Sequence, residues 1–210
     1  MSKLTEDLET SATHIRSYFI AEDEMREKTL HLCRQVTQYS ARAIRAVHRQ
    51  EQGKARQLLD SAHKLIQEIN LDLGQHSKLL HSGLVHDAQK EFAEGCITLA
   101  LISEKDLPEP EALGISYAAY LNGLGEAVGE LRRYILDSLR RGDFSRCEEL
   151  LTTMDDIHGV LMTMDFPEAV THGLRRTSDA TRSIIERTRG DVTIALRQRE
   201  LETKLYNSVV

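Results

Sequence analysis

The sequence predicts an all-α fold, and three observations support that prediction. The 210 residues contain only three prolines, Pro108, Pro110 and Pro167, so no proline interrupts the first half of the chain. Leucine, alanine, arginine, glutamate and glutamine dominate and favour helices, whereas aromatic residues make up only 5% of the chain. No Asn-Gly or Asp-Gly pair lies between two segments of alternating polarity, which is the usual mark of a β-hairpin.

Four helices are expected before the first proline. The second and third are indicated by apolar residues three and four positions apart, as at Val36, Tyr39, Ala43 and Val47. Glycines at positions 53 and 74 mark two of the breaks between them. The four predicted ranges are Ser2–Tyr18, Ala21–Glu51, Lys54–Asp72 and Lys78–Glu104.

The segment "KDLPEPEALGIS" separates these helices from three more. Gly142 follows two arginines, which suit a helix C-terminus, and Pro167 is placed at the first position of the last helix. No internal repeat occurs, so we expect one domain over residues 1–210: a single antiparallel bundle of six to seven helices. Residues 1–20 are its N-terminal helix, and 203–210 are a candidate for a disordered tail. The later ranges are Tyr117–Arg141, Phe144–Met164 and Pro167–Leu205.

Charge and composition exclude several classes of protein. The net charge of −6 gives no overall basic signature, so a nucleic-acid partner would need a local basic face. The three cysteines are widely spaced and fit neither a disulfide framework nor a zinc site, which favours the cytoplasm. No signal-peptide core and no apolar run of bilayer length is found, so no membrane partner is expected.

Two pairs of glutamates are candidates for chemistry. A helix turns by about 100° per residue, so Glu91 and Glu94 differ by about 60° and share a face. Glu126 and Glu130 differ by about 40° and share a face as well. Like charges so placed repel unless something compensates them. The alternative reading, a solvated or salt-bridged helix surface, stays open on spacing alone.

A glycine cluster favours bringing the two pairs together. Gly123, Gly125 and Gly129 surround the second pair, although glycine costs about 1 kcal/mol in a helix interior. We therefore expect another helix or a ligand to approach that backbone closely. Four converging carboxylates would suit Mg²⁺, with Mn²⁺ as the alternative, because hard cations prefer oxygen ligands. Such a metal can activate water for attack on a phosphodiester.

Basic side chains for a nucleic-acid partner lie mainly on the second predicted helix. Arg42, Arg45 and Arg49 are three and four residues apart and form one stripe that could follow a phosphate backbone. A solvated face that complements acidic neighbours is the alternative. His86 and Arg133 are further candidate RNA contacts beside the two glutamate pairs.

Four segments in order, "VTQYSARAIRAVHR", "GLVHDAQKEFAEG", "SYAAYLNGLGEAVGELRRYILDSLRRGDFSR" and "FPEAV", resemble the translin / translin-associated factor X family. The pair in "EFAE" resembles its catalytic, factor-X-like branch. The resemblance implies a Mg²⁺-dependent endoribonuclease that cleaves single-stranded or loosely paired RNA inside a closed homo-oligomer, usually an octamer. It implies Glu91, Glu94 and Glu126 as metal ligands and catalytic residues, with Glu130 beside them. The family pattern has aspartate where this chain has Glu126.

Three other functions are weighed against this one. The first is a non-catalytic oligomer of the translin type that binds single-stranded RNA or DNA. The second is a ferritin-like di-iron protein, but such bundles use two Glu-x-x-His motifs and this chain has none. The third is a scaffold whose helix faces bind protein partners alone.

Overall fold

The computed structural model describes residues 3–74, 77–80 and 82–209, and all regular structure in these ranges is helical. The predicted all-α class is thus confirmed. Among the described helices, none has both the length and the hydrophobicity needed to cross a bilayer. Six are long: α1 (Lys3–His48), α2 (Gln52–Asp72), α4 (Gly83–Ile102), α6 (Tyr117–Arg140), α7 (Cys147–Met162) and α9 (Leu174–Val209). Three have four residues each: α3 (Ser77–Leu80), α5 (Pro110–Leu113) and α8 (Glu168–Thr171).

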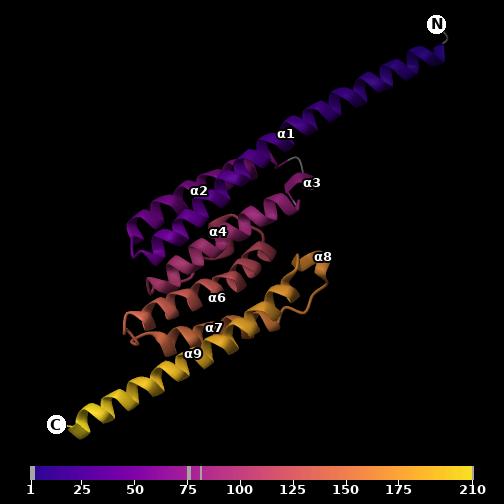
Figure 1. Cartoon of the computed structure of the whole chain (residues 1–210). Coiled ribbons are helices and arrows are strands. Elements are labelled where there is room, and N and C mark those ends of the chain that lie inside the picture. Colours follow the sequence, from indigo (N-terminus) through magenta and orange to yellow (C-terminus); the bar gives the residue numbers. More distant parts are fainter. Residues whose placement is uncertain (1–2, 75–76, 81, 210) are drawn as a thin grey trace.

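The long helices form a layered bundle (Figure 1). The half of α1 nearer its C-terminus packs against α2, and both contact α4. Helix α6 packs against α4 on one side and against α7 and α9 on the other. The first part of α1 and the last part of α9 extend beyond the bundle at opposite ends of the molecule (Figure 1). Helices α4 and α6 therefore lie in the middle of the stack, where a site between them is sheltered.

The core explains why α4 is the most apolar of the long helices. Phe92, Ala93 and Ile97 of α4 are buried, as are Val36 of α1 and Leu131 of α6. These side chains belong to one hydrophobic cluster to which all six long helices contribute. The carboxylates of α4 therefore enter a helix that is otherwise held in the interior.

Two predicted helix boundaries in the first half of the chain are wrong. The sequence predicts two helices over residues 2–18 and 21–51, but Lys3–His48 is one continuous helix. The intervening "FI" contains neither glycine nor proline, so nothing there interrupts the hydrogen-bond ladder. In the predicted helix Lys78–Glu104, α3 is separate and α4 begins only at Gly83.

The last predicted helix differs in three ways. His172 and Gly173 have φ angles of 49° and 88°, and this left-handed turn separates α8 from α9. Pro167 is the residue that caps α8, and not its first helical residue. Helix α9 continues to Val209, so residues 203–209 are helical and not the expected disordered tail; residue 210 lies outside the described residues. No glycine or proline follows Gly190, so the sequence offers no stop signal there.

Two glycines of α6 permit the close packing that the sequence predicts. A Cβ atom at Gly123 would lie 2.6 Å from Cβ of Ala93 and 2.8 Å from the carbonyl oxygen of Lys90, both on α4. One at Gly125 would lie 2.4 Å from Cγ2 of Thr177 on α9. Gly129 differs, because a Cβ atom there would have no neighbour within 4 Å, so no close approach occurs at that position.

Replacing Gly123 by alanine is expected to destabilise the protein by about 1–3 kcal/mol, because the α4 backbone must move away from the added methyl group. Replacing Gly129 by alanine is the matched control and should stabilise the same helix by up to about 1 kcal/mol, since only helix propensity changes. Urea denaturation of both variants measures the two free energies of unfolding. Equal values for the two variants would contradict the close contact between α4 and α6.

Candidate metal centre

Three of the four predicted carboxylates meet between α4 and α6. One oxygen from each of Glu91, Glu94 and Glu126 lies within 4.8 Å of the other two. Glu91 and Glu94 come from adjacent turns of α4, and the contact at Gly123 brings α6 against the same stretch of α4. Glu126 reaches the same point from α6. We call these three residues the carboxylate trio.

Burial and mutual repulsion make two of these carboxylates hard to ionise. Burial, followed by the charges of Glu126, Glu91 and Glu130, raises the pKa of Glu94 to about 8. The pKa of Glu91 is also raised, by burial first and then by Glu126. A cation placed among the trio would remove much of this penalty.

Lys90 is the cation that the protein itself supplies. Its Nζ atom lies 2.7 Å from Oε1 of Glu126. Burial alone would lower the pKa of Lys90, but the hydrogen bond to Glu126 and the charges of Glu126, Asp87 and Glu91 outweigh burial and raise that pKa. One lysine therefore faces three carboxylates, and the fully ionised cluster keeps an excess of negative charge.

Glu130 lies beside the trio and not within it. Its Oε2 atom forms a hydrogen bond with Nε2 of His48 on α1, and Nη1 of Arg133 lies 3.8 Å from the same oxygen. Glu130 is nevertheless close enough to contribute to the raised pKa of Glu94. Arg133, a predicted RNA contact, is about half exposed while it pairs with Glu130.

The trio fits a hard divalent cation. Ligand oxygens on opposite sides of a Mg²⁺ ion lie about 4 Å apart, given Mg–O distances near 2.1 Å, so small side-chain rotations suffice. All three donors are carboxylate oxygens, which suit Mg²⁺ or Mn²⁺ better than they suit zinc or copper. Three ligands leave the remaining coordination positions to water or to a phosphate oxygen.

The predicted arginine stripe is exposed at the C-terminal end of α1, with Arg49 just beyond the last helical residue, His48. Arg42, Arg45 and Arg49 all point to solvent, and in the described ranges no carboxylate forms an ion pair with them. His48 lies on the same helix, one turn beyond Arg45, and contacts Glu130. The stripe and the buried His48 therefore lie on different faces of the chain, with the stripe turned to solvent.

His86, another predicted RNA contact, is buried on α4 and stacks against His172. The ring centroids are 4.5 Å apart and the ring planes differ by 19°. Both rings line a pocket of about 560 Å³ that Lys90, Glu94 and Glu126 also line. Burial, followed by the charge of His172, lowers the pKa of His86, so its ring is neutral at physiological pH.

No family model matches this chain. Among solved structures, the crystal structure of AfC3PO is 31% identical and covers 90% of this chain and 98% of its own, with a TM-score of 0.81. The chain belongs to the translin family. A second structure, the complex of AfC3PO with duplex RNA, is 30% identical to this translin-family chain with the same coverage and a TM-score of 0.81.

Two more distant relatives are also found. Apo-NeC3PO is only 17% identical but covers 88% of this chain and 96% of its own with a TM-score of 0.79, so it shares the fold. An uncharacterized protein of Methanocaldococcus jannaschii is 27% identical over 194 residues, which are 91% of this translin-family chain and 86% of the relative.

Sequence reasoning missed the residues that surround the trio in space. Lys90 stands directly before Glu91 in "KEFAEG", but spacing alone does not show that it reaches Glu126. His48 forms a hydrogen bond with Glu130, which lies 82 residues further along the chain. His172 stacks on His86 only because the chain turns between α8 and α9. A search for polar side chains on the buried faces of neighbouring helices would have suggested His48, but not its partner.

Proposed function

We propose that this translin-family chain is a metal-dependent endoribonuclease of the factor-X-like branch. The carboxylate trio is the observation that carries the proposal, because Glu91, Glu94 and Glu126 converge from two helices at a partly buried point. The raised pKa values of Glu91 and Glu94 support it, since a cluster of this kind is costly without a cation. Mg²⁺ is the proposed metal, and Mn²⁺ would fit the same oxygen ligands.

Each residue around the site has a distinct proposed role. Glu91, Glu94 and Glu126 would hold the metal, which when bound supplies a more acidic water and stabilises negative charge on a phosphate. Lys90 holds the carboxylate of Glu126 in the metal-free protein through their 2.7 Å ion pair. His48 and Arg133 fix the carboxylate of Glu130 beside the trio.

RNA is the proposed substrate because the related AfC3PO binds it. That protein, at 30% identity, is solved with duplex RNA. We propose single-stranded or loosely paired RNA for this chain, with single-stranded DNA as a further ligand. Recognition would rest on the phosphate backbone, since the exposed stripe of Arg42, Arg45 and Arg49 supplies positive charge that can follow it.

A cleavage assay separates this proposal from a non-catalytic binding protein. End-labelled single-stranded RNA, the matching duplex and single-stranded DNA are each incubated with the protein in Mg²⁺, in Mn²⁺ and in EDTA. We expect internal cleavage of single-stranded RNA with either metal and none in EDTA. Tight binding of all three nucleic acids without cleavage in any metal would indicate a translin-type binding protein instead.

The arginine stripe makes a prediction about salt dependence. Replacing Arg42, Arg45 and Arg49 together by glutamine should weaken RNA binding. The slope of log affinity against log salt concentration should become less steep by about 2, because each lost phosphate contact reduces that slope by about 0.7 for single strands. Binding titrations from low to high salt, in EDTA, measure this slope. Arg140, Arg182 and Arg197 are exposed but already paired with carboxylates, so their triple glutamine variant should keep the wild-type slope.

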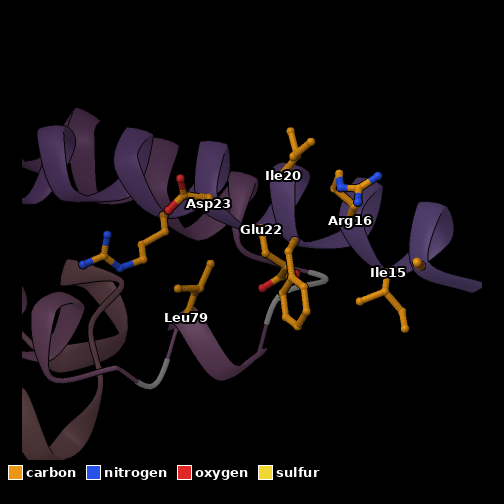
Figure 2. A pocket seen from close by; sticks show the side chains of 9 residues that line it. Ile15, Arg16, Ile20, Glu22, Asp23 and Leu79 are labelled. Atoms are coloured by element: carbon orange, nitrogen blue, oxygen red, sulfur yellow. The ribbon is translucent and has the colours of Figure 1, made fainter.

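We further propose that the chain assembles into a closed homo-oligomer, with an octamer as the expected form. The projecting part of α1 exposes Ile15, Phe19 and Ile20, each more than half accessible. Beside it, an open groove includes Leu79 of α3 (Figure 2). In that view Leu79 faces α1 from below, whereas Ile20 points to the opposite side of the helix. Apolar surface on two sides of a projecting helix favours contacts with further copies.

Replacing Phe19 by aspartate is expected to lower the mass of the assembly, because a charge would be buried at an apolar contact between subunits. Size-exclusion chromatography with light scattering measures that mass. Val160, an exposed apolar residue on α7, provides the matched control, and its aspartate variant should keep the wild-type mass. Equal masses for both variants would show that the projecting part of α1 does not contribute to the interface between subunits.

A further inference from the structure

A pocket large enough to hold a ligand lies beside the carboxylate trio. Its volume is about 560 Å³, within the usual range for ligand sites. It shares Glu94 and Glu126 with the trio, so any molecule in it lies next to the proposed metal. Its other walls come from α4, from α6, from the segment that joins α8 to α9, and from the first turns of α9.

An unusual backbone conformation places one wall of this pocket. His172 has φ 49° and ψ 55°, a left-handed conformation that residues other than glycine adopt at a cost of about 1–2 kcal/mol. Gly173 follows with φ 88°. This turn is what brings the ring of His172 onto the ring of His86. Strain of this kind is common where a side chain must be held for function.

Some polar side chains of the pocket are engaged in hydrogen bonds that hold the fold, and others are available to contact a ligand. Asn122 donates to the carbonyl oxygens of Ala118 and Thr171 and accepts from Oγ1 of Thr177, so its side chain is fully used. Among the residues that the structure describes, neither ring of the His86–His172 pair forms a hydrogen bond. His86 is buried behind His172, whose own side chain is exposed to the pocket.

The charges around the pocket are mixed. Glu94, Glu126 and Asp87 contribute negative charge, and Lys90 and Arg176 contribute positive charge on the same lining. Arg176 is exposed and forms no ion pair within the described part of the chain, so it can approach a phosphate group. A flat aromatic ring, a free arginine and a neighbouring metal site together match the parts of one nucleotide.

We propose that this pocket is a nucleotide subsite, in which a base next to the cleaved phosphodiester stacks on the ring of His172. The inference rests on the proposed RNA-cleaving function of the trio. Histidine rings are among the side chains on which unpaired RNA bases stack, and His86 behind His172 extends the stack. Arg176 pairs with the phosphate of the stacked nucleotide. The subsite positions the substrate and tolerates any base, because every base has an aromatic face.

The test uses single-stranded RNAs that each carry one 2-aminopurine, whose fluorescence falls when it stacks. The protein variants are His172→Gly and His172→Asn, which remove the imidazole and tolerate the left-handed backbone, and His172→Phe, which keeps an aromatic ring. Glu104, which lies beyond the C-terminal end of α4, also has a positive φ, of 54°. Its variant Glu104→Gly is the control, because it relieves the same kind of backbone strain without changing His172. Binding is measured in EDTA and cleavage in Mg²⁺.

We expect the wild-type protein, His172→Phe and Glu104→Gly to quench one labelled position strongly. His172→Gly and His172→Asn should lose that quenching and raise KM by about 5- to 100-fold, as expected for one lost base stack, with kcat changed far less. If both ringless variants match the wild-type protein in quenching and KM, the subsite is overturned. If the wild-type protein shows the His172-dependent quenching but cleaves no RNA, the subsite stands and the nuclease proposal fails.

Discussion

Replacing Glu91 and Glu94 together by alanine is expected to lower the rate of Mg²⁺-dependent RNA cleavage by about 10³-fold or more. Two of the three carboxylates that converge within 4.8 Å would be lost, so the metal would be held weakly or not at all. Metal ions contribute several kcal/mol to the stabilisation of charge in such reactions, and each 1.4 kcal/mol is about a factor of ten in rate. Initial rates of cleavage at saturating RNA measure the effect.

The double variant has a matched control on the same protein. Glu24 and Glu27 are also three residues apart on one helix, but both are exposed on α1. Their double alanine variant should cleave at the wild-type rate. RNA affinity measured in EDTA should change little in either variant, because neither pair belongs to the arginine stripe. Wild-type cleavage by the Glu91 and Glu94 variant would exclude the trio as the catalytic metal centre.

The metal-free protein is expected to lose stability as the pH rises from about 5 to about 8. The pKa of Glu94 is about 8 in the folded protein against an ordinary value of 4.5, so between these values the folded state binds more protons than the unfolded state. Stability must then fall as the pH rises, and the raised pKa of Glu91 adds a contribution of the same sign. The loss is on the order of 3 kcal/mol, from about 1.4 kcal/mol per pKa unit.

Mg²⁺ should reverse this trend, because it binds only the deprotonated carboxylates. At a hundred times its dissociation constant the metal adds about 2.7 kcal/mol, and that dissociation constant becomes smaller as the pH rises. Thermal unfolding from pH 5 to 8.5, in EDTA and in Mg²⁺, measures both effects. Glu94→Gln should remove most of the pH dependence in EDTA, whereas Glu24→Gln should leave it unchanged. A metal-free protein whose stability is flat over this range would contradict the buried acidic cluster.

The trio was predictable because it depends on local spacing and on one packing signal. Residues three or four apart share a helix face wherever the helix forms, and this holds for Glu91 with Glu94. The glycines of α6 then indicated a close contact, and Gly123 makes it against Lys90 and Ala93 of α4. Gly129 makes no such contact, so the presence of three glycines did not show which of them lies against another helix.

The separation of Glu130 from the trio was not predictable from spacing. Glu126 and Glu130 share a face of α6, but His48 and Arg133 hold Glu130 while Lys90 pairs with Glu126. His48 lies near the end of α1, and only the packing of α1 in three dimensions places it there. The continuity of α1 was missed for a related reason, since the exposed residues 3–24 lack the buried stripe by which the rest of the helix was recognised.

The most direct test of the central claim is a crystal of this protein soaked in Mn²⁺ and examined for anomalous scattering. We expect one strong peak between Glu91, Glu94 and Glu126, with metal–oxygen distances of about 2.2 Å and Lys90 moved away from Glu126. A map with no peak among the three carboxylates, in which Lys90 still contacts Glu126, would contradict the account.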